Sequence, residues 1–577
     1  MKKEILKHAL GLCLVFTVLF VGICFAQKAP KEEFDFPKLN KIKMPEIKEK
    51  TFDNGLRIFL VEDHHFPTID FQAAFGAGSM YEPKEKIGLA AMTGILLRTG
   101  GTISMTGDEI DKELETLAAS IETSVGLNYG ILRISSLKED IDKIIPIAVD
   151  ILQNPIFAED KIELAKVQLR AGIARRNDNV RQIQSREFNK IIYGAESPYA
   201  RHEEYATIES ISRDDLIAYH QRFFHPNNMI MTVWGDFKTK EMINQLKRTF
   251  GKLKPAELDI PPAPEVSYDY KTTINYIDKQ DLNQSNILMG HIGGRYDNPD
   301  YPALLVMNQI LTMDRMFKKI RSDEGLAYNV FGYYGVALDH PGIFNAGAQT
   351  KSESTVYALS LMIKEIEWMT QEEVTDEELN RGKDEFLYSY VFNYDSKEKI
   401  VNRMLTFAHF GYPLDFADRI KQGVEGVTKA DVLRVAREYL KPDKLQILVT
   451  GNKQDFDEPL SVLGEVNEID ITIPEPPGSA DPNAKAITLS PEELQKYEGE
   501  YSTPLAPLKI SLTVKDAVLS AQVAGQPAFL LTPFSNTEFR FEPAGVVIEF
   551  STNDEGYVQY DSFTLKQMGQ SIPFKRE

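Results

Sequence analysis

Two stretches of the chain show the same order of apolar and polar positions, at a separation of 216 residues. The segments that begin at Ile211 and Val427 align without a gap, and each has a hydroxyl residue in second place, Ser212 or Thr428. An aspartate three residues after each hydroxyl predicts a capped helix start, and apolar residues at helical spacing are followed by a short apolar strand. The repeat therefore predicts a duplicated chain, in which the same helix and strand recur as an α+β unit.

Beyond the second copy the pattern changes to short runs of alternating apolar and polar residues, such as LKISLTV and GVVIEFS, which predict a small antiparallel barrel or sandwich. Proline-rich polar segments separate the parts of the chain. The predicted parts are a leader at 1–26, a first half at 47–253, a linker at 254–269, a second half at 270–466, a Pro-rich linker at 467–489 and a β domain at 490–577. The predicted fold class is α+β, with two duplicated α/β-sandwich halves followed by a small all-β barrel-like domain.

The first 26 residues have a basic start, the apolar run LCLVFTVLFVGICF and the sequence CFA before QK, which is typical of a secretory signal peptide. We expect cleavage after Ala26 and export to the periplasm or the exterior. The run is shorter than the roughly 20 residues of a membrane span, so no stable span is predicted in the mature chain. Lipid attachment at Cys24 is the alternative, although Ile23 stands where a lipobox has a small residue. The other cysteine, Cys13, also lies in this segment, which leaves the mature chain without disulfides or thiolate metal ligands.

Composition and charge narrow the classes of function. A chain of 577 residues with 43% apolar and 26% charged residues has an ordinary globular composition, and it is too long for one hydrophobic core. Asp and Glu number 85 against 65 Lys and Arg, for a formal net charge of −20. Because such an acidic chain repels phosphate backbones, we expect no nucleic-acid partner.

Residues 88–101, GLAAMTGILLRTGG, follow a predicted strand and the segment FQAAFGAGSMYEP. Over residues 47–466 this order resembles the pitrilysin and insulinase family of zinc metallopeptidases, whose catalytic members carry H-x-x-E-H on this helix. The two histidines bind zinc and the glutamate activates the metal-bound water. The resemblance implies a degenerate former zinc site, because the three motif positions and the position of the third ligand hold no metal-binding side chain. These positions are Ala91, Gly94, Ile95 and Gly172.

The second half contains FKKIRSDEGLAYNVFGYY, in which Arg321 and Tyr328 are seven residues apart. This spacing resembles the R-x(6)-Y signature of the same family, in which the pair faces the zinc site and stabilises the developing oxyanion. A guanidinium supplies fixed charged donors and a phenol supplies a short hydrogen bond, which suits that chemistry. The resemblance implies that Arg321 and Tyr328 are catalytic residues that act in a site whose metal is held elsewhere. The preceding ILTMDRMF departs from the glycine-rich and serine-rich family pattern.

The segment ASIETSVGLNYG, residues 119–130, falls where the family has a sheet-edge strand to which an extended substrate pairs. The predicted substrate-binding residues are Ser120, Ile121, Glu122 and Thr123. The alternative interpretation is an ordinary edge strand on which Glu122 prevents aggregation.

Together these features predict a non-catalytic, substrate-binding subunit of an exported two-chain zinc peptidase. The expected partner is a related chain with an intact H-x-x-E-H motif, in a heterodimer that acts on short or unfolded peptides. Zinc is expected only in that partner, and this chain is expected to have no cofactor. The alternative is a stand-alone peptide- or protein-binding pseudopeptidase with no role in hydrolysis. The β domain resembles lipocalin-like domains appended to exported bacterial hydrolases, a likeness that names no ligand.

Overall fold

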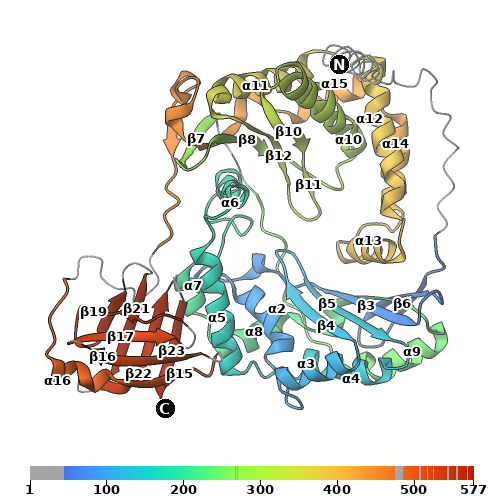
Figure 1. Cartoon of the computed structure of the whole chain (residues 1–577). Helices are drawn as coiled ribbons and strands as arrows, with labels where there is room; N and C mark the ends of the chain where they lie inside the picture. Colours follow the sequence, from blue (N-terminus) through green and yellow to red (C-terminus); the bar gives the residue numbers. More distant parts are fainter. Residues whose placement is uncertain are drawn as a thin grey trace, which may run out of the picture. The chain divides into compact units, whose positions relative to one another are not determined.

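The duplicated pattern corresponds to two six-stranded sheets, which a nine-stranded sheet follows in the chain (Figure 1). The structure, a computed structural model, describes residues 44–266, 268, 271–474, 485–505, 508–515, 517–523, 526–541, 545–553, 556–567 and 570–577. The predicted leader at 1–26, with Cys24, lies outside these residues, as do Tyr270 and residues 475–484 of the second predicted linker. No helix within the described ranges is long and apolar enough to cross a bilayer.

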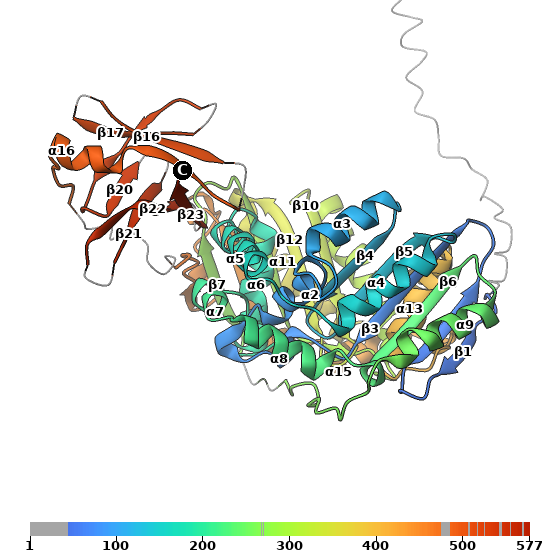
Figure 2. The same cartoon turned by 90° about the horizontal axis from the view of Figure 1, so that it is seen from below.

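The first sheet has the strand order β1-β2-β6-β3-β5-β4, in which only β2 and β6 run parallel. Its core forms between one face of the sheet and a layer of helices, and Phe71, Leu96 and Phe223 are among the residues buried there. Figure 2 shows α4 and α9 lying over the strands of this sheet. The strands are β1 (Lys48–Thr51), β2 (Arg57–Glu62), β3 (Thr68–Phe75), β4 (Ser120–Val125), β5 (Gly130–Leu137) and β6 (Met229–Gly235). The helices of the layer are α2 (Leu89–Thr99), α3 (Gly107–Thr116), α4 (Ile141–Gln153), α5 (Glu159–Ala174), α8 (Arg213–Phe223) and α9 (Thr239–Arg248), and α7 (Tyr205–Glu209) contacts α5.

The second sheet repeats this topology with the order β14-β7-β13-β8-β12-β10. The parallel pair β7 and β13 corresponds to β2 and β6, whereas the edge strand β14 runs parallel to its neighbour and β1 does not. The strands are β7 (Thr273–Asp278), β8 (Gln284–Ile292), β10 (Ala327–Tyr334), β12 (Ile343–Lys351), β13 (Gln446–Gly451) and β14 (Val466–Glu468), with a short parallel pair of β9 (Gly294–Arg295) and β11 (Val336–Ala337) beside them. The helices are α10 (Tyr301–Gln309), the π-helix η5 (Ile310–Asp323), α11 (Thr355–Gln371), α12 (Asp376–Ser389), α14 (Phe416–Gly426) and α15 (Lys429–Tyr439).

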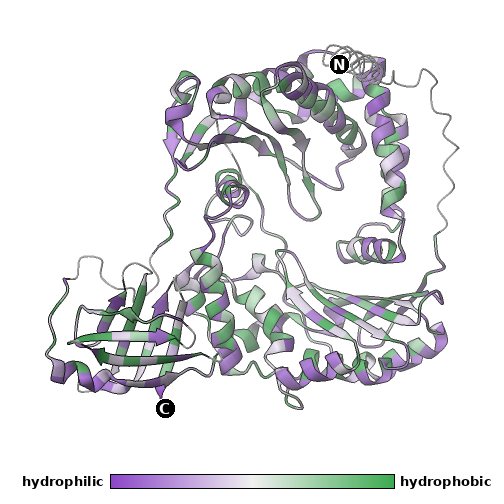
Figure 3. Ribbon diagram, in the orientation of Figure 1, coloured by the Kyte–Doolittle hydropathy of each residue, from purple (hydrophilic) through white to green (hydrophobic). Residues whose placement is uncertain are grey.

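The repeated helix starts have the predicted caps. The Ser212 hydroxyl accepts a hydrogen bond from the backbone N–H of Asp215 at 3.3 Å, and the Thr428 hydroxyl accepts one from Asp431 at 3.2 Å. The helices are two-sided in polarity, as expected when one face is buried (Figure 3). The strand order and the caps together confirm the duplication.

Two equivalent helices are exchanged between the halves. Helix α6 (Val180–Tyr193) of the first half buries Ile183 and Phe188 against the second sheet, in contact with Leu448 of β13. Helix α13 (Lys397–His409) of the second half packs in the same way on the first sheet. Each sheet is therefore covered on its second face by a helix that the other half supplies.

The third sheet is antiparallel and nearly closed, with the order β18-β17-β16-β15-β23-β22-β21-β20-β19. Its two end strands are separated in the chain by Leu531 alone, which brings the sheet edges together. Phe539, Phe550 and Phe563 are buried inside, so side chains fill the barrel. The strands are β15 (Gly499–Ser502), β16 (Lys509–Lys515), β17 (Val518–Val523), β18 (Phe529–Leu530), β19 (Thr532–Pro533), β20 (Glu538–Phe541), β21 (Val546–Thr552), β22 (Val558–Gln567) and β23 (Gln570–Arg576), and the capped helix α16 (Pro491–Leu494) precedes them.

Candidate functional site

Helix α2 begins at a point fixed by a buried carboxylate. Gly88 has a φ of 106°, a conformation that favours glycine, and it precedes the first turn. The Glu82 side chain, 5% exposed, accepts hydrogen bonds from the backbone N–H groups of Gly88 at 3.3 Å and Ala90 at 2.5 Å. Burial, together with the nearby Glu203 carboxylate, outweighs these donors and raises the pKa of Glu82 to about 7.

The former motif positions on α2 lie against the edge strand β4. A Cβ added to Gly94 would stand 2.5 Å from the backbone nitrogen of Val125 and 2.8 Å from the carbonyl carbon of Ser124. The Thr123 hydroxyl donates a hydrogen bond to the Gly94 carbonyl at 2.6 Å, which holds the helix in place. Ile95 points to solvent and is 41% exposed. The helix therefore lies too close to β4 for a glutamate at position 94.

The position of the third ligand is different, because Gly172 lies on α5 with open space around it. Beyond the adjacent backbone of α5, no heavy atom of the described residues comes within 4 Å of a Cβ added there. The four positions of the former zinc site therefore do not fit a zinc ion. None of their side chains has a ligand atom, and position 94 has no room for one; the positions are Ala91, Gly94, Ile95 and Gly172. Over the described ranges of the chain, no cluster of three or more His, Cys, Asp and Glu side chains is arranged to hold a metal.

The predicted substrate-binding residues Ser120, Ile121, Glu122 and Thr123 are the first four of β4. This strand is at the edge of the first sheet and pairs with β5 alone among the described strands. Ile121 and Thr123 face the helix layer, whereas Ser120 and Glu122 are exposed. The Glu122 carboxylate lies 3.6 Å from Nε of Arg98. The open edge satisfies the geometric requirement for strand addition, and the binding role stays a prediction.

Arg321 and Tyr328 are brought together at the edge of the second sheet. Arg321 is in the last turn of η5, and its guanidinium carbon lies 5.3 Å from the centroid of the Tyr328 ring. Tyr328 is 75% exposed, and the register of β10 against β12 shifts between Ala327 and Asn329. Such a bulge re-aims the side chain of the extra residue, and bulges are frequent beside functional sites. The bulge leaves the phenol out of the core and beside the guanidinium.

Hydrogen bonds to the β10 backbone fix this arrangement. The Thr312 hydroxyl on η5 donates to the Gly332 carbonyl at 2.6 Å and accepts from the Gly332 N–H at 3.3 Å. The Asn308 amide makes a matching pair of bonds with the backbone of Tyr334. Gly325, with a φ of 66°, allows the turn between η5 and β10. The sequence ILTMDRMF, which departs from the family pattern, forms the start of the π-helix, a conformation often found at functional sites.

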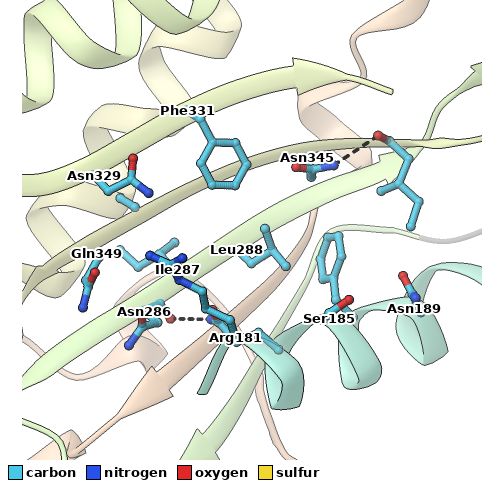
Figure 4. Close-up of a pocket in the computed structure, with 14 residues that line it drawn as sticks. Arg181, Ser185, Asn189, Asn286, Ile287, Leu288, Asn329, Phe331, Asn345 and Gln349 are labelled. Atoms are coloured by element: carbon cyan, nitrogen blue, oxygen red, sulfur yellow. Dashed lines mark hydrogen bonds between the residues drawn. The ribbon is translucent and has the colours of Figure 1, made fainter. Parts of the chain in front are cut away.

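A cavity of about 370 Å³ adjoins this edge, on the face of the second sheet that α6 only partly covers. Asn329 and Phe331 of β10 point into it opposite Arg181 and Ser185 of α6 (Figure 4). The buried Gln184 donates a hydrogen bond to the Asn286 carbonyl at 2.8 Å and ties the helix to the sheet. Further amide side chains line the cavity, and they are Asn189, Asn286, Asn345 and Gln349. Amides that both donate and accept suit a peptide backbone or a polar side chain.

Sequence reasoning missed this cavity because its walls come from different halves of the chain. The only local signal is the alternation of Asn329 and Phe331 with the buried Val330, which places the first two on the face away from the helix layer. Nothing in the sequence indicates that α6 lies opposite them.

Comparisons with known proteins agree with this geometry. The family model described as Insulinase (Peptidase family M16) matches residues 57–199, and the model described as Peptidase M16 inactive domain matches residues 210–386. The chain is 25% identical to an uncharacterized zinc protease of Rickettsia felis over 61% of this chain and 82% of that one. It is 22% identical to the non-peptidase homolog YmxG of Helicobacter pylori, over 72% of this chain and 94% of that one. The periplasmic protease PqqL of Escherichia coli has a similar fold, with a TM-score of 0.64 and 13% identity over 85% of this chain and 56% of that one.

Proposed function

Because the chain belongs to the insulinase (M16) peptidase family and its role in that family is a non-catalytic one, we propose that it is the substrate-binding subunit of an exported two-chain zinc peptidase. It contributes Arg321 and Tyr328 to a site whose zinc is carried by a related partner with an intact H-x-x-E-H helix. The isolated chain is inactive, and the pair of chains hydrolyses peptides.

One contrast between the two halves carries this proposal. Position 94 has no room for a side chain, whereas the exposed Arg321 of η5 lies next to the exposed Tyr328 on the bulged, open edge strand β10. An exposed tyrosine on an edge strand gives the fold no packing, and a hydrophobic edge promotes aggregation. Its position beside a guanidinium is explained by a ligand that approaches from outside the chain.

The chemistry follows from the two donors. As a peptide carbonyl becomes tetrahedral, negative charge develops on its oxygen, and preorganised donors lower the energy of that state more than that of the ground state. Arg321 supplies a permanently charged N–H group and Tyr328 an O–H group. Neither has to touch the metal, so the donors and the metal can belong to different chains.

Peptide recognition uses the open edges and the cavity. An extended peptide pairs with Ser120–Thr123 through main-chain hydrogen bonds, a mode that requires free backbone groups more than particular side chains. The amide-lined cavity beside Asn329 and Phe331 receives a side chain of the same peptide. A folded protein cannot present an extended segment to a strand edge, so short or unfolded peptides are the substrates.

Export is proposed from the leader at 1–26. The fold neighbour PqqL, which is periplasmic, is consistent with this location. Zinc is needed only in the partner.

The test is to mix this chain with its zinc-bearing relative and to measure cleavage of an unstructured peptide. Arg321→Ala and Tyr328→Phe are each expected to lower turnover by about 10²-fold, the effect of losing one oxyanion donor. Arg419→Ala on α14 and Tyr388→Phe on α12 remove an exposed arginine and an exposed tyrosine elsewhere and are the matched controls. Turnover within threefold of the wild type for both site variants contradicts the assigned roles.

The alternative, a stand-alone peptide-binding protein, is favoured by the cavity, because its amide-rich lining can hold a peptide without any metal. That alternative predicts full peptide affinity without the partner and no contribution to hydrolysis. If the mixture cleaves no faster than the zinc-bearing chain alone while this chain still binds the peptide, the alternative holds.

A further inference from the structure

A second cavity, of about 650 Å³, lies where helix α13 meets β10, β11 and the 3-10 helix η7 (Tyr390–Asn393). Its walls are rich in aromatic rings, among them Tyr296, Tyr333 and Phe392. Phe392 is 64% exposed and Tyr333 41%, so the rings line an open hollow and are not part of a sealed core. Exposed aromatic rings around polar groups are typical of a binding site.

The charge of this cavity is opposite to that of the chain. Among the described residues that line it are Lys399 and Arg403 but no Asp or Glu, in a protein with 85 acidic and 65 basic residues. The Lys399 ammonium donates to the Asp395 carboxylate at 2.8 Å and to the Phe392 carbonyl at 3.0 Å, which offsets its charge. The Arg403 guanidinium instead lies 5.3 Å from the ring centroid of Tyr394 and forms no ion pair with any described carboxylate. Arg403 is the group available to an anion.

A neighbouring atom lacks a hydrogen bond. Asn402 also lines the cavity, and its side-chain oxygen is buried without a donor among the described residues. A buried acceptor without a partner costs about 1–3 kcal/mol, so a ligand that supplies a donor gains affinity there. The cavity therefore presents a planar cation that pairs bidentately with a carboxylate, and next to it an acceptor for an N–H group.

Packing holds these groups in place. Ile400 and Met404 on one face of α13 are buried against Phe59 of the first sheet. Arg403 and Phe407, four residues apart, share another face, which lines the cavity. Because the helix is fixed on one side, its polar groups are preorganised on the other, which reduces the entropy lost on binding.

We infer that this cavity binds a carboxylate of the peptide substrate, with Arg403 as the anion site and Asn402 as acceptor for a peptide N–H. The inference rests on the proposed function and extends it to a substrate class, peptides that carry a C-terminal carboxylate or an acidic side chain. Tyr333 of β10 lines this cavity, and Asn329 and Phe331 of the same strand line the other. At about 3.3 Å per residue, Tyr328 and Tyr333 are about 17 Å apart along the strand, so an extended peptide places its carboxylate about five residues from the Arg321 and Tyr328 pair.

Binding of labelled unstructured peptides to the full chain, followed by fluorescence anisotropy, tests this inference. Three peptides of one sequence are compared, with a free C-terminus, with an amidated C-terminus, and amidated with one internal glutamate. Amidation is expected to weaken binding to the wild type at least tenfold, and Arg403→Gln to weaken binding of the free-carboxylate peptide by the same factor. Amidation should not weaken peptide binding to Arg403→Gln any further, because amidation and the substitution remove the same contact. If the internal glutamate restores the affinity of the amidated peptide, side-chain carboxylates are ligands as well.

Arg419→Gln is the matched control, because this arginine lies on α14 outside the cavity and pairs with Asp415. Arg403→Lys keeps the charge and loses the bidentate geometry, and it should give an intermediate affinity. If peptides bind but amidation and Arg403→Gln each change the affinity by less than twofold, or if their effects add, this inference is wrong and the proposed function stands. If no peptide binds the wild-type chain, both are wrong.

Discussion

The two strand edges at the centre of the proposed function, β4 and β10, have equivalent places in the two sheets and opposite surroundings. At β4 the helix with the former metal positions lies so close that Gly94 has no room for a Cβ. At β10 a bulge turns Tyr328 outward to Arg321, and the cavity beside it is open. The first site is closed at position 94, whereas the second has its polar groups exposed. At that position helix and strand form a packed interface with no room for a glutamate.

The largest difference is expected between the free energies of unfolding of two variants, in which a glutamate replaces Gly94 or Gly172. Gly94→Glu forces a side chain into the β4 backbone and buries a charge, and it is expected to lower the free energy of unfolding by more than about 3 kcal/mol. Gly172→Glu enters open space and gains helix propensity, so stability should change by less than about 1 kcal/mol. Chemical denaturation measures both.

Gly172→Glu is the matched control for the same change of side chain. Equal stability of the two variants would show that α2 can move away from β4, and the first site would then be open as well.

The buried carboxyl group of Glu82, at the start of α2, should make the stability of the fold depend on pH. Burial raises the pKa of Glu82 to about 7 from its usual 4.5, so the folded state holds its proton more tightly than the unfolded state. The resulting stability is fully present below pH 4.5 and is lost as the pH rises through 7, by up to about 3 kcal/mol. Glu82→Gln should remove this slope, so that the variant loses less stability than the wild type between pH 5 and pH 8.

Thermal or chemical unfolding at the two pH values gives the comparison. Glu85→Gln, on the exposed 3-10 helix Lys84–Lys86, is the control and should keep the wild-type slope. An unchanged slope in Glu82→Gln would mean that this carboxyl does not hold its proton in the folded chain.

The smallest expected effects come from the two threonines that join a helix to each strand. Thr312→Val loses two hydrogen bonds with Gly332 and should cost about 1–2 kcal/mol, while Thr123→Val loses one bond to Gly94 and should cost about 1 kcal/mol. In the two-chain assay Thr312→Val should lower turnover more than Thr123→Val does, because it loosens the support of Arg321 and Tyr328, whereas the peptide pairs with β4 through main-chain groups that Thr123→Val keeps. A larger loss of turnover with Thr123→Val would mean that the support of β4 matters more to turnover than the support of Arg321 and Tyr328.

Much of this fold could be predicted from local sequence. The caps at Ser212 and Thr428 depend on residues three positions apart, and the strands follow from apolar runs. The replaced positions Ala91, Gly94 and Ile95 could be found because the frame of their helix is intact. The alternation in SIETSV could not indicate which strand is at an edge, so the edge position of 120–125 depended on the family resemblance.

The rest depends on contacts between distant segments. The bulge at Tyr328 is a one-residue shift that leaves the apolar pattern of β10 readable in either register. The closure at Gly94 depends on how near α2 lies to Val125, a distance that no spacing in the sequence encodes. Both cavities combine residues of exchanged helices with strands more than sixty residues away, as with Arg403 and Tyr333. An apolar face in the sequence of a helix predicts that this face is buried, but it does not predict which sheet the helix covers.

The exchange of α6 and α13 has a consequence for how the chain can be divided. Each half, expressed without the other, would leave one face of its sheet bare and would carry a helix whose apolar face has nothing to cover. The two halves are thus a single cooperative folding unit, and a protease cut in the connection at 254–269 would yield a nicked but still associated protein.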